Sequence, residues 1–265
     1  MKRWSLLLCI FMLGLGIAAV SCSTAGASET SSSIPEAIRQ KAYEMLNDPA
    51  YSAASGVNVH YSIDNNGNYS DIKVILNDPQ KYENDKAAVA KAADEFYNNY
   101  IEGKIPEGSI DWRFKREMEI IKFMVANIDY AYNRDMIYDD YSAYGALINH
   151  QAVCDGYAKC FNVLAKRCGI ESAKVNGNGH AWNIVRLDDG NYYHLDVCWE
   201  DPIVNGEPNK IYGYERLRNT YINITSDKIK EIGGEPHAQW IPAEYDCSAD
   251  VYGTDKVNRY FIGLR

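Results

Sequence analysis

The sequence predicts a chain built from both helices and antiparallel strands. Helical spacing of apolar residues recurs in three segments, residues 85–100, 113–130 and 154–168. Alternating apolar residues on either side of turn-forming residues occur in two segments, 57–76 and 180–199, and each predicts a β-hairpin. The chain of 265 residues therefore contains helical and strand patterns along most of its length.

The N-terminal residues 1–27 are predicted to be an export signal. Two basic residues precede an apolar run at 6–20 that is too short to span a bilayer and ends in small residues. Two processing sites fit: a small-x-small peptidase site at Ala25-Gly26-Ala27, and a lipoprotein-like box, Ala19-Val20-Ser21-Cys22, in which Cys22 would be acylated. Both place the mature protein outside the cytoplasm, and residues 28–33 would form a Ser/Thr-rich tether.

The charge of the chain argues against a nucleic-acid partner. Removal of the signal would take Lys2 and Arg3 with it and move the net charge from −9 to −11, whereas nucleic-acid binding requires a basic face. Contact with a membrane is expected only through the signal or a lipid anchor. The remaining residues, about 238, are enough for one full core. We divide them into an N-terminal helix and β-hairpin elaboration at 34–80, in which residues 34–47 are the helix, and a catalytic domain at 81–265. The sequence does not indicate an oligomeric state.

The cysteines are expected to be mostly unpaired and buried. Of seven cysteines, five remain in the mature chain if Cys9 is removed and Cys22 is removed or lipidated. Cys160 and Cys168 lie eight residues apart on one predicted helix, too far apart to bridge. No CxxC pair is present, so a zinc site has little support, and we expect neither a metal nor a cofactor.

Three short segments carry the residues needed for thiol chemistry. They are Val153-Cys154-Asp155-Gly156-Tyr157-Ala158, Gly179-His180-Ala181-Trp182-Asn183, and His194-Leu195-Asp196-Val197-Cys198-Trp199-Glu200-Asp201-Pro202. A nucleophile, a base and an orienting carboxylate are the minimum set for attack on an amide. Cys154 begins a predicted helix that Gly169 ends, and the positive end of a helix dipole lowers the pKa of a thiol.

The register of the second hairpin tests whether His180 and Asp196 can meet. A two-residue loop, Asp189-Gly190, would put the two side chains on opposite faces of the sheet. A three-residue loop, Asp188 to Gly190, pairs Trp182 with Asp196 and makes His180 and Asp196 diagonal neighbours on one face, ~7–8 Å apart. Glycine at the third loop position fits a type I turn with a G1 bulge. We therefore predict the three-residue loop, with the returning strand running from residue 191 to 199.

At these three segments the chain resembles the transglutaminase-like superfamily of papain-type cysteine enzymes. Bacterial exported members carry V-C-x-G-Y-A, H-A-W-N and D-x-T-W-x-D-P segments, and residues 143–202 match all three, about a quarter of the chain. The strand expected at 221–224 also resembles the strand that follows in these proteins. A short helix is expected after Thr225. Cys198 departs from the pattern, since Thr is usual there, and it places a second thiol beside the predicted site.

The resemblance implies an α+β fold with a transglutaminase-like or papain-like core, in which N-terminal helices pack on an antiparallel sheet. It also implies that Cys154 is the nucleophile, His180 the base and then the acid, and Asp196 the orienting carboxylate. The backbone N–H of Cys154 would be one oxyanion donor. The second donor stays open among Gln151, Asn149 and Tyr144.

Other histidines and aromatic residues have competing interpretations. His194 shares the predicted face of Asp196 and is the alternative base, whereas the three remaining histidines are read as structural: His60, His150 and His237. Cys160 and Cys168 are read as core residues. The predicted substrate-binding residues are Gln151, Tyr157, Trp182 and Trp199, although core packing would explain the two tryptophans almost as well.

Two functions of different classes follow. The first is an extracytoplasmic thiol enzyme that acts on protein or peptide amides through a thioester, with peptidase or amidase activity favoured over protein cross-linking. The second is a non-catalytic surface module that binds peptide or cell-wall polymer. A third, weaker hypothesis is redox control through Cys154 and Cys198.

Overall fold

The computed structural model describes residues 6–10, 20–22, 45, 48, 51–54, 57–63, 69–76, 78–131, 138–201, 203–204, 207–208, 219–238 and 245–262. It combines helices with antiparallel sheets, so the predicted α+β class is confirmed. In the described residues, three α-helices precede the central helix α5 (Cys154–Arg167): α2 (Pro79–Phe96), which passes into a π-helical turn η3 (Tyr97–Ile101), α3 (Trp112–Asn127) and the short α4 (Ala143–Leu147). The predicted helices at 85–100 and 113–130 correspond to α2 with η3 and to α3.

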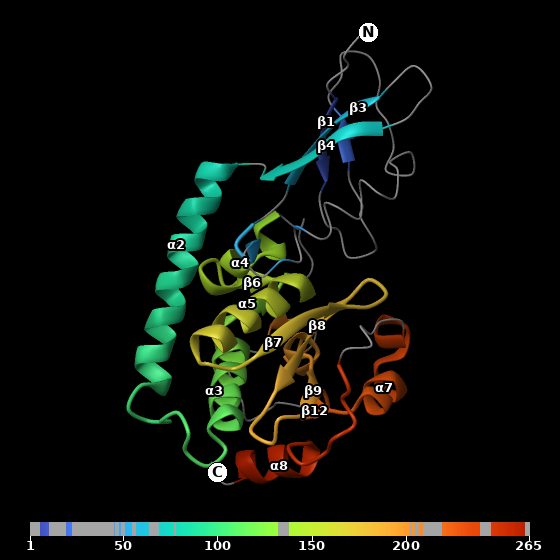
Figure 1. Ribbon diagram of the computed structural model, residues 1–265. Coiled ribbons are helices and arrows are strands. Elements are labelled where there is room, and N and C mark those ends of the chain that lie inside the picture. Colours follow the sequence, from blue (N-terminus) through green and yellow to red (C-terminus); the bar gives the residue numbers. More distant parts are fainter. Residues whose placement is uncertain are drawn as a thin grey trace.

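The main sheet has four antiparallel strands in the order β12-β9-β8-β7. They are β7 (Ser172–Asn176), β8 (Ala181–Arg186), β9 (Tyr192–Leu195) and β12 (Ile222–Ile224). The central helix, α5 (Cys154–Arg167), contacts β7 and β8 as well as α2, α3 and α4 (Figure 1). Gly169 follows it with φ +72°, the left-handed conformation expected of a C-terminal cap.

The two faces of this sheet bury different sets of side chains. Val185 and Leu195 pack with α5 in the larger core, whereas Trp182 and Ile184 pack with Ile229 of α7 (Ser226–Ala238), a helix kinked at Gly234. Successive strand residues point to opposite faces, so α5 and α7 cover opposite sides of the sheet. In Figure 1 the sheet lies between them. The short helix predicted after Thr225 is therefore α7.

The register of the β8–β9 hairpin is the predicted one. Asn183 pairs with Leu195 and Arg186 with Tyr192, so the loop is Asp188 to Gly190. Gly190 has φ +79°, and its N–H donates to the carbonyl of Leu187 at 3.0 Å, as a turn with a G1 bulge requires.

The predicted extent of the returning strand was wrong. β9 ends at Leu195, and residues 197–200 form a helical turn, α6 (Val197–Glu200). Asp196 is the N-cap of α6, and its Oδ1 accepts a hydrogen bond from the backbone N–H of Trp199 at 3.0 Å. A capping aspartate leaves the β ladder because it must satisfy the free amides of the helix that follows. The ladder pair predicted between Trp182 and Asp196 is therefore absent.

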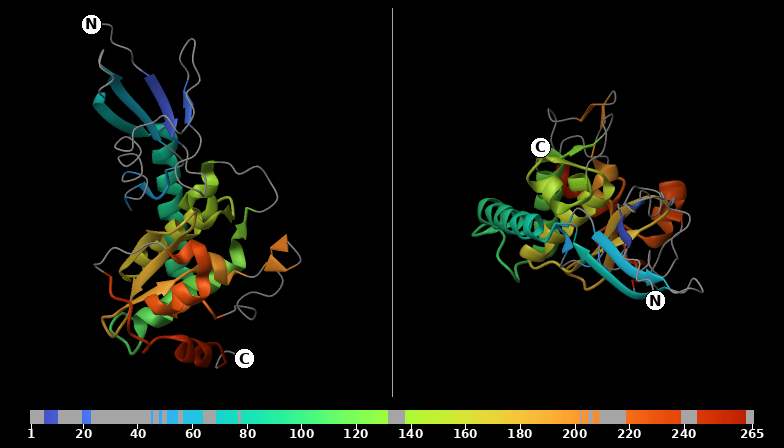
Figure 2. Two further views of the ribbon diagram at one scale, coloured as in Figure 1. Left: turned by 90° about the vertical axis from the view of Figure 1, so that its right-hand side faces the viewer. Right: turned by 90° about the horizontal axis from the view of Figure 1, so that it is seen from above.

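The predicted N-terminal hairpin is present as β3 (Val57–Ile63) and β4 (Tyr69–Leu76). It stands at one end of the molecule beyond α2, away from the main sheet (Figures 1 and 2). Two segments of the predicted signal extend this sheet in the full-length chain: β1 (Leu6–Ile10) pairs with β3, and β2 (Val20–Cys22) pairs with β1. Cleavage at Ala27 would remove both and leave β3 and β4. The predicted tether at 28–33 lies outside the described residues, as does the helix at 34–47 except for Met45.

Shorter elements complete the fold. β5 (Asp129–Tyr130) pairs in parallel with β6 (Gln151–Ala152), and β10 (Ile203–Val204) pairs with β11 (Glu207–Pro208). A 3-10 turn, η4 (Tyr138–Tyr141), precedes α4, and α8 (Thr254–Ile262), which the sequence did not predict, contacts β12. The predicted boundary between residues 80 and 81 falls inside the first turn of α2.

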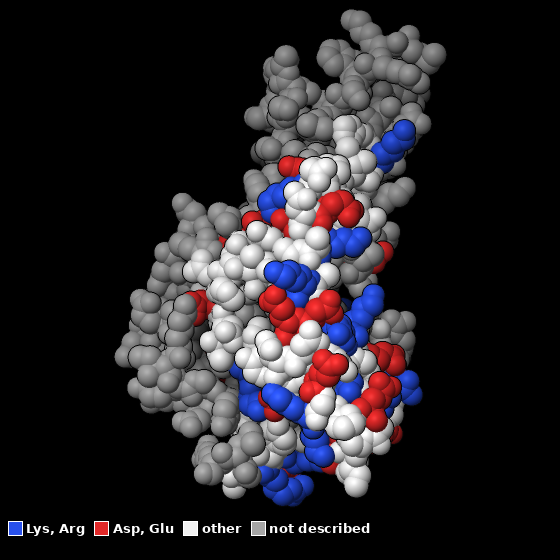
Figure 3. Space-filling model, turned by 90° about the vertical axis from the view of Figure 1, so that its left-hand side faces the viewer, with Lys and Arg blue, Asp and Glu red and all other residues white. Residues whose placement is uncertain are grey.

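The face over α2 carries acidic and basic side chains side by side (Figure 3). No helix among the described residues has the length and apolarity needed to cross a membrane.

Candidate active site

Cys154 is the first residue of α5, as predicted. The preceding Val153 has extended backbone, and its N–H donates to the carbonyl of Asp140 at 3.0 Å, which anchors the start of the helix to η4. Glycine is needed at 156, because a Cβ there would lie 2.4 Å from the same carbonyl oxygen. No side chain caps the N-terminus of α5, so its amide groups are available to the Cys154 thiol or to an oxyanion. The Cys154 side chain is 8% exposed and packs against Ala158 of α5.

His180 and Asp196 form a buried hydrogen-bonded pair. His180 lies at the end of the Gly-rich turn that enters β8, and its Nε2 is 2.6 Å from Asp196 Oδ2. His180 is 9% exposed and Asp196 is fully buried. Because Nε2 is bonded to the carboxylate, Nδ1 is the ring nitrogen left for Cys154, whose thiol is also hydrogen-bonded to the ring.

The surroundings of His180 favour its protonated form. Burial lowers the pKa of His180, but the charge of Asp196, the hydrogen bond to it and the interaction with Cys154 together raise that pKa to about 10. Burial raises the pKa of Asp196, yet the charge and hydrogen bond of His180, with the contact from His237, hold it below its usual value. A protonated imidazole beside a thiol stabilises the thiolate, which is the nucleophilic form of cysteine.

Three buried charges lie directly behind the nucleophile. Asp155 Oδ2 is 2.7 Å from Lys159 Nζ, and Asp155 Oδ1 is paired with Lys174 Nζ. The pKa of Asp155 is lowered, since the two lysine charges outweigh its burial. Burial lowers the pKa of Lys174 although the charges of Asp155 and Cys154 act in the opposite direction. Lys159 and Lys174 thus hold the Asp155 carboxylate in place at the start of α5, next to Cys154.

His194, the alternative base, points away from His180. Its Nδ1 accepts a hydrogen bond from Trp182 Nε1 at 3.1 Å, and its Nε2 is 3.2 Å from Ser226 Oγ. Burial and then the positive charges of His237 and Lys230 lower its pKa to about 3. His194 therefore orients Trp182. Of these two histidines, His180 is the one that contacts Asp196.

The two tryptophans flank His180 in different ways. The ring of Trp182 stacks at 5.9 Å and 19° from the ring of His180, but Trp182 is only 1% exposed, so its place is that of a core residue behind the imidazole. Trp199 lies 5.3 Å from the same ring and is partly exposed. Of the two, Trp199 is the one that a substrate can reach.

The prediction that Tyr157 contacts substrate does not fit its position. The side chain is 1% exposed, and its hydroxyl lies 3.1 Å from the carbonyl oxygen of Ile128 and donates to the Asp201 carboxylate. Tyr157 thus ties α5 to the end of α6, and burial raises the pKa of Asp201 to about 7. Gln151 is partly exposed in β6, three residues before Cys154, and stays a candidate for substrate contact and for the second oxyanion donor.

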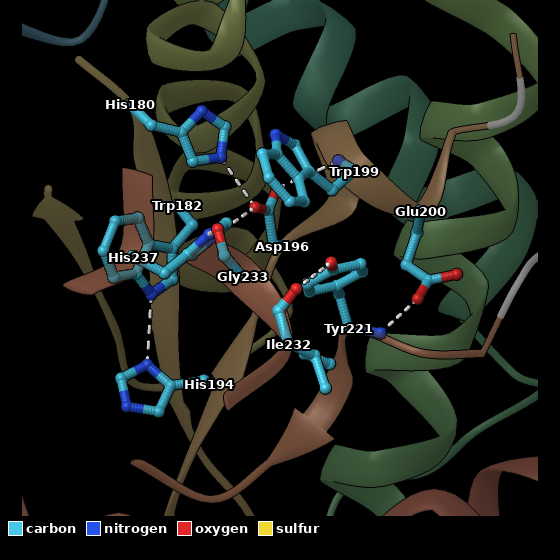
Figure 4. A network of polar contacts seen from close by, with 10 residues as sticks. All are labelled: His180, Trp182, His194, Asp196, Trp199, Glu200, Tyr221, Ile232, Gly233 and His237. Carbon is cyan, nitrogen blue, oxygen red and sulfur yellow. Dashed lines mark hydrogen bonds and ion pairs between the residues drawn. The ribbon is translucent and has the colours of Figure 1, made fainter. Parts of the chain in front are cut away.

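His237, read from the sequence as structural, lies at the centre of the site. Its Nε2 is 2.8 Å from Asp196 Oδ2, and its Nδ1 is 3.0 Å from the carbonyl oxygen of Gly233 (Figure 4). The ring is fully buried and lies 4.6 Å from Trp182. Sequence reasoning missed it because no spacing links residue 237 to the three motifs. The one signal, a histidine after the pair Gly233-Gly234, is too weak to identify such a site.

Within the described part of the chain, one group of side chains has donor atoms that all lie within 4.8 Å of one another, close enough to hold a metal ion: His180, Asp196 and His237. In this structure both imidazoles are hydrogen-bonded to the carboxylate. The five cysteines that follow the predicted signal are free: Cys154, Cys160, Cys168, Cys198 and Cys247. The expectation of unpaired, mostly buried thiols is thereby confirmed for these residues. Cys198 is partly exposed and packs against Cys154, where the redox hypothesis places it.

Comparison with known proteins finds a family match in part of the chain. Residues 107–197 match the model of the transglutaminase-like superfamily, which supports the predicted resemblance over these residues. No curated protein matches the sequence. Among solved structures, a candidate cysteine protease from Cytophaga hutchinsonii is 20% identical with a TM-score of 0.34, over 45% of this chain and 40% of that chain. A TGase is 14% identical with a TM-score of 0.35, over 67% of this chain and 52% of that chain. This chain thus spans less than two thirds of either protein.

Proposed function

We propose that this protein, whose residues 107–197 match the transglutaminase-like superfamily, is a cysteine-dependent acyl-transfer enzyme that acts on amides of proteins or peptides outside the cytoplasm. The observation that carries the proposal is the arrangement of one ring: His180 bonds Asp196 through Nε2 at 2.6 Å and interacts with the thiol of Cys154 at the start of α5. This is the order of contacts that nucleophilic catalysis by a cysteine requires.

The proposed reaction proceeds in two steps. The Cys154 thiolate attacks the amide carbonyl carbon, and the negative charge that develops on the oxygen is held by amide N–H groups at the start of α5. His180 then donates its proton to the amide nitrogen, so the C–N bond breaks, an amine leaves and a thioester remains. In the second step His180 removes a proton from water as the water oxygen attacks the thioester carbon. The C–S bond then breaks, which releases the acid and restores the Cys154 thiolate beside protonated His180. Asp196 holds the ring in place through both steps.

Either water or an amine can resolve the thioester, and the resemblance to bacterial exported members favours water. We therefore infer peptidase or amidase activity ahead of protein cross-linking. The predicted export signal, with its two predicted processing sites, supports an extracytoplasmic location, with a peptide or protein as the partner. The intact mass of the chain recovered from the cell envelope distinguishes the two processing sites, since acylation of Cys22 adds the mass of the lipid.

The test uses Cys154→Ala, with Cys247→Ala as the matched control because Cys247 is another buried free cysteine. Both variants and the wild type are incubated with iodoacetamide near neutral pH and with a library of thiol-directed peptide electrophiles, and intact mass is recorded. We expect Cys154→Ala to lose both labelling and peptide turnover, whereas Cys247→Ala keeps both. Unchanged turnover in Cys154→Ala would refute the enzyme. Peptide binding that is equal with and without Cys154, with no acylation at all, would favour the surface binding module instead.

A further inference from the structure

Asp196 receives a second histidine that the proposed triad does not use. Oδ2 of the carboxylate contacts Nε2 of His180 at 2.6 Å and Nε2 of His237 at 2.8 Å, while Oδ1 accepts the N–H of Trp199 at 3.0 Å. Asp196 and His237 are both fully buried. In Figure 4 the two imidazoles approach the carboxylate from different elements, His180 from the start of β8 and His237 from α7.

The hydrogen-bond partners of His237 determine where its protons are. Nδ1 lies 3.0 Å from the carbonyl oxygen of Gly233, and a carbonyl only accepts, so Nδ1 carries a proton. Nε2 lies against Asp196, which accepts while it is ionised, so Nε2 also carries a proton. His237 is then a cation. With the His180 imidazolium, the Asp196 carboxylate and the Cys154 thiolate, the four groups carry no net charge, which makes their joint burial feasible.

Two glycines provide the space for His237. A Cβ on Gly233 would lie 2.3 Å from Nδ1 of His237, so only glycine allows the ring to sit over this turn of α7. A Cβ on Gly177 would lie 2.0 Å from the carbonyl oxygen of Pro236, and that oxygen accepts the N–H of Asn178 at 3.1 Å. The loop that delivers His180 is therefore bonded to the residue just before His237. The two histidines are positioned by one connected piece of backbone.

We propose that His237 is a positioning residue of the reaction: through Nε2–H it holds the Asp196 carboxylate against His180, and its charge stabilises the thiolate. This inference depends on the function proposed above. His237 is fully buried behind Asp196, so it acts through the carboxylate and makes no contact with substrate. The titratable groups that face it are His180 before β8, His194 on β9, Asp196 at the cap of α6, and Tyr221 beside β12.

Two amide variants separate the bond to Asp196 from the bond to Gly233. In His237→Gln the amide nitrogen can occupy the place of Nε2 and donate to Asp196. In His237→Asn it can occupy the place of Nδ1 and donate only to Gly233. We expect kcat to fall about 10- to 100-fold in His237→Asn, the range for loss of a hydrogen bond to a charged group, and by clearly less in His237→Gln. KM should change little in both variants.

The pH profile tests the charge. Loss of a cation makes the thiolate harder to form and the imidazolium of His180 harder to lose. Both limbs of the kcat/KM profile should therefore move to higher pH in His237→Gln, and thermal melting of each variant reports whether it is folded. With a purely structural role, the variants would lose thermal stability and activity together while the pH profile of kcat/KM stayed in place. His237→Asn would then be the more active of the two variants. Either result would overturn the proposal. If Cys154→Ala kept its turnover, the enzyme itself would be refuted; if only the His237 variants matched the wild type, this inference alone would fail.

Discussion

Replacement of Asp196 by Asn tests how much of the reactivity of Cys154 depends on one buried charge. Burial alone would lower the pKa of His180, yet the charge of Asp196, its hydrogen bond and the Cys154 contact raise that pKa from 6.5 to about 10. A difference of about 3.5 pKa units corresponds to about 5 kcal/mol in favour of the imidazolium. Asn keeps the shape of the side chain and can still cap α6 with its oxygen in the place of Oδ1. Its amide nitrogen then stands in the place of Oδ2, so the variant removes the charge together with the acceptor that faces His180 and His237.

Without that charge, the pKa of His180 should fall from about 10 toward its ordinary value of 6.5, because burial still lowers it and only the interaction with Cys154 still raises it. A ring whose pKa reached 6.5 would be protonated in about a tenth of the molecules at pH 7.5. We expect alkylation of Cys154 near neutral pH to slow at least about tenfold, and turnover to fall further, by about 10³–10⁴-fold, since His180 also serves as the acid.

The assay is the rate of iodoacetamide labelling from pH 5 to 10, followed by intact mass. Asp189→Asn is the control, because Asp189 is an exposed carboxylate in the same hairpin. The half-maximal rate of Asp196→Asn should move to higher pH while that of Asp189→Asn stays with the wild type. Superimposable profiles for all three proteins would refute the assignment of Asp196 as the group that keeps His180 protonated.

Three further predictions concern other residues. Burial raises the pKa of Glu117 from 4.5 to about 8, so the protein should lose about 5 kcal/mol of stability as the pH rises from 4.5 to 8. The calorimetric Tm of Glu117→Gln should fall less over this range than that of the wild type. Parallel Tm curves for the two proteins would contradict this prediction. A Cβ at Gly177 would lie 2.0 Å from the Pro236 carbonyl oxygen, so Gly177→Ala should lower the free energy of unfolding in urea by about 1–3 kcal/mol and also lower turnover. Wild-type values for both would contradict this prediction. If a disulfide between Cys198 and Cys154 regulates the enzyme, a reductant should raise the activity of the wild type and remove the two-hydrogen mass loss of the oxidised protein. The activity of Cys198→Thr should not respond to reductant. A wild type that also does not respond would refute the redox hypothesis.

The local structure around Cys154 and the pairing of the β8–β9 hairpin could be predicted from the sequence. A helix that begins at Cys154 and ends at Gly169 requires only an apolar period and a residue that adopts positive φ. The three-residue loop that ends at Gly190 set which residues of β8 and β9 share a face, because a one-residue slip would exchange the faces. These are short-range effects, and they were sufficient to bring His180 and Asp196 within reach of each other.

Long-range packing decided the rest. The strand expected to continue to residue 199 stops at Leu195, because Asp196 caps a helical turn while its other oxygen serves two histidines. His237 joins the site only because α7 packs on the sheet face that carries Trp182 and His194, and no local pattern indicates which helix covers which face. The burial of Tyr157 was hidden for the same reason. Sequence periodicity describes which side of an element is apolar, whereas the neighbour that covers this side depends on the whole chain.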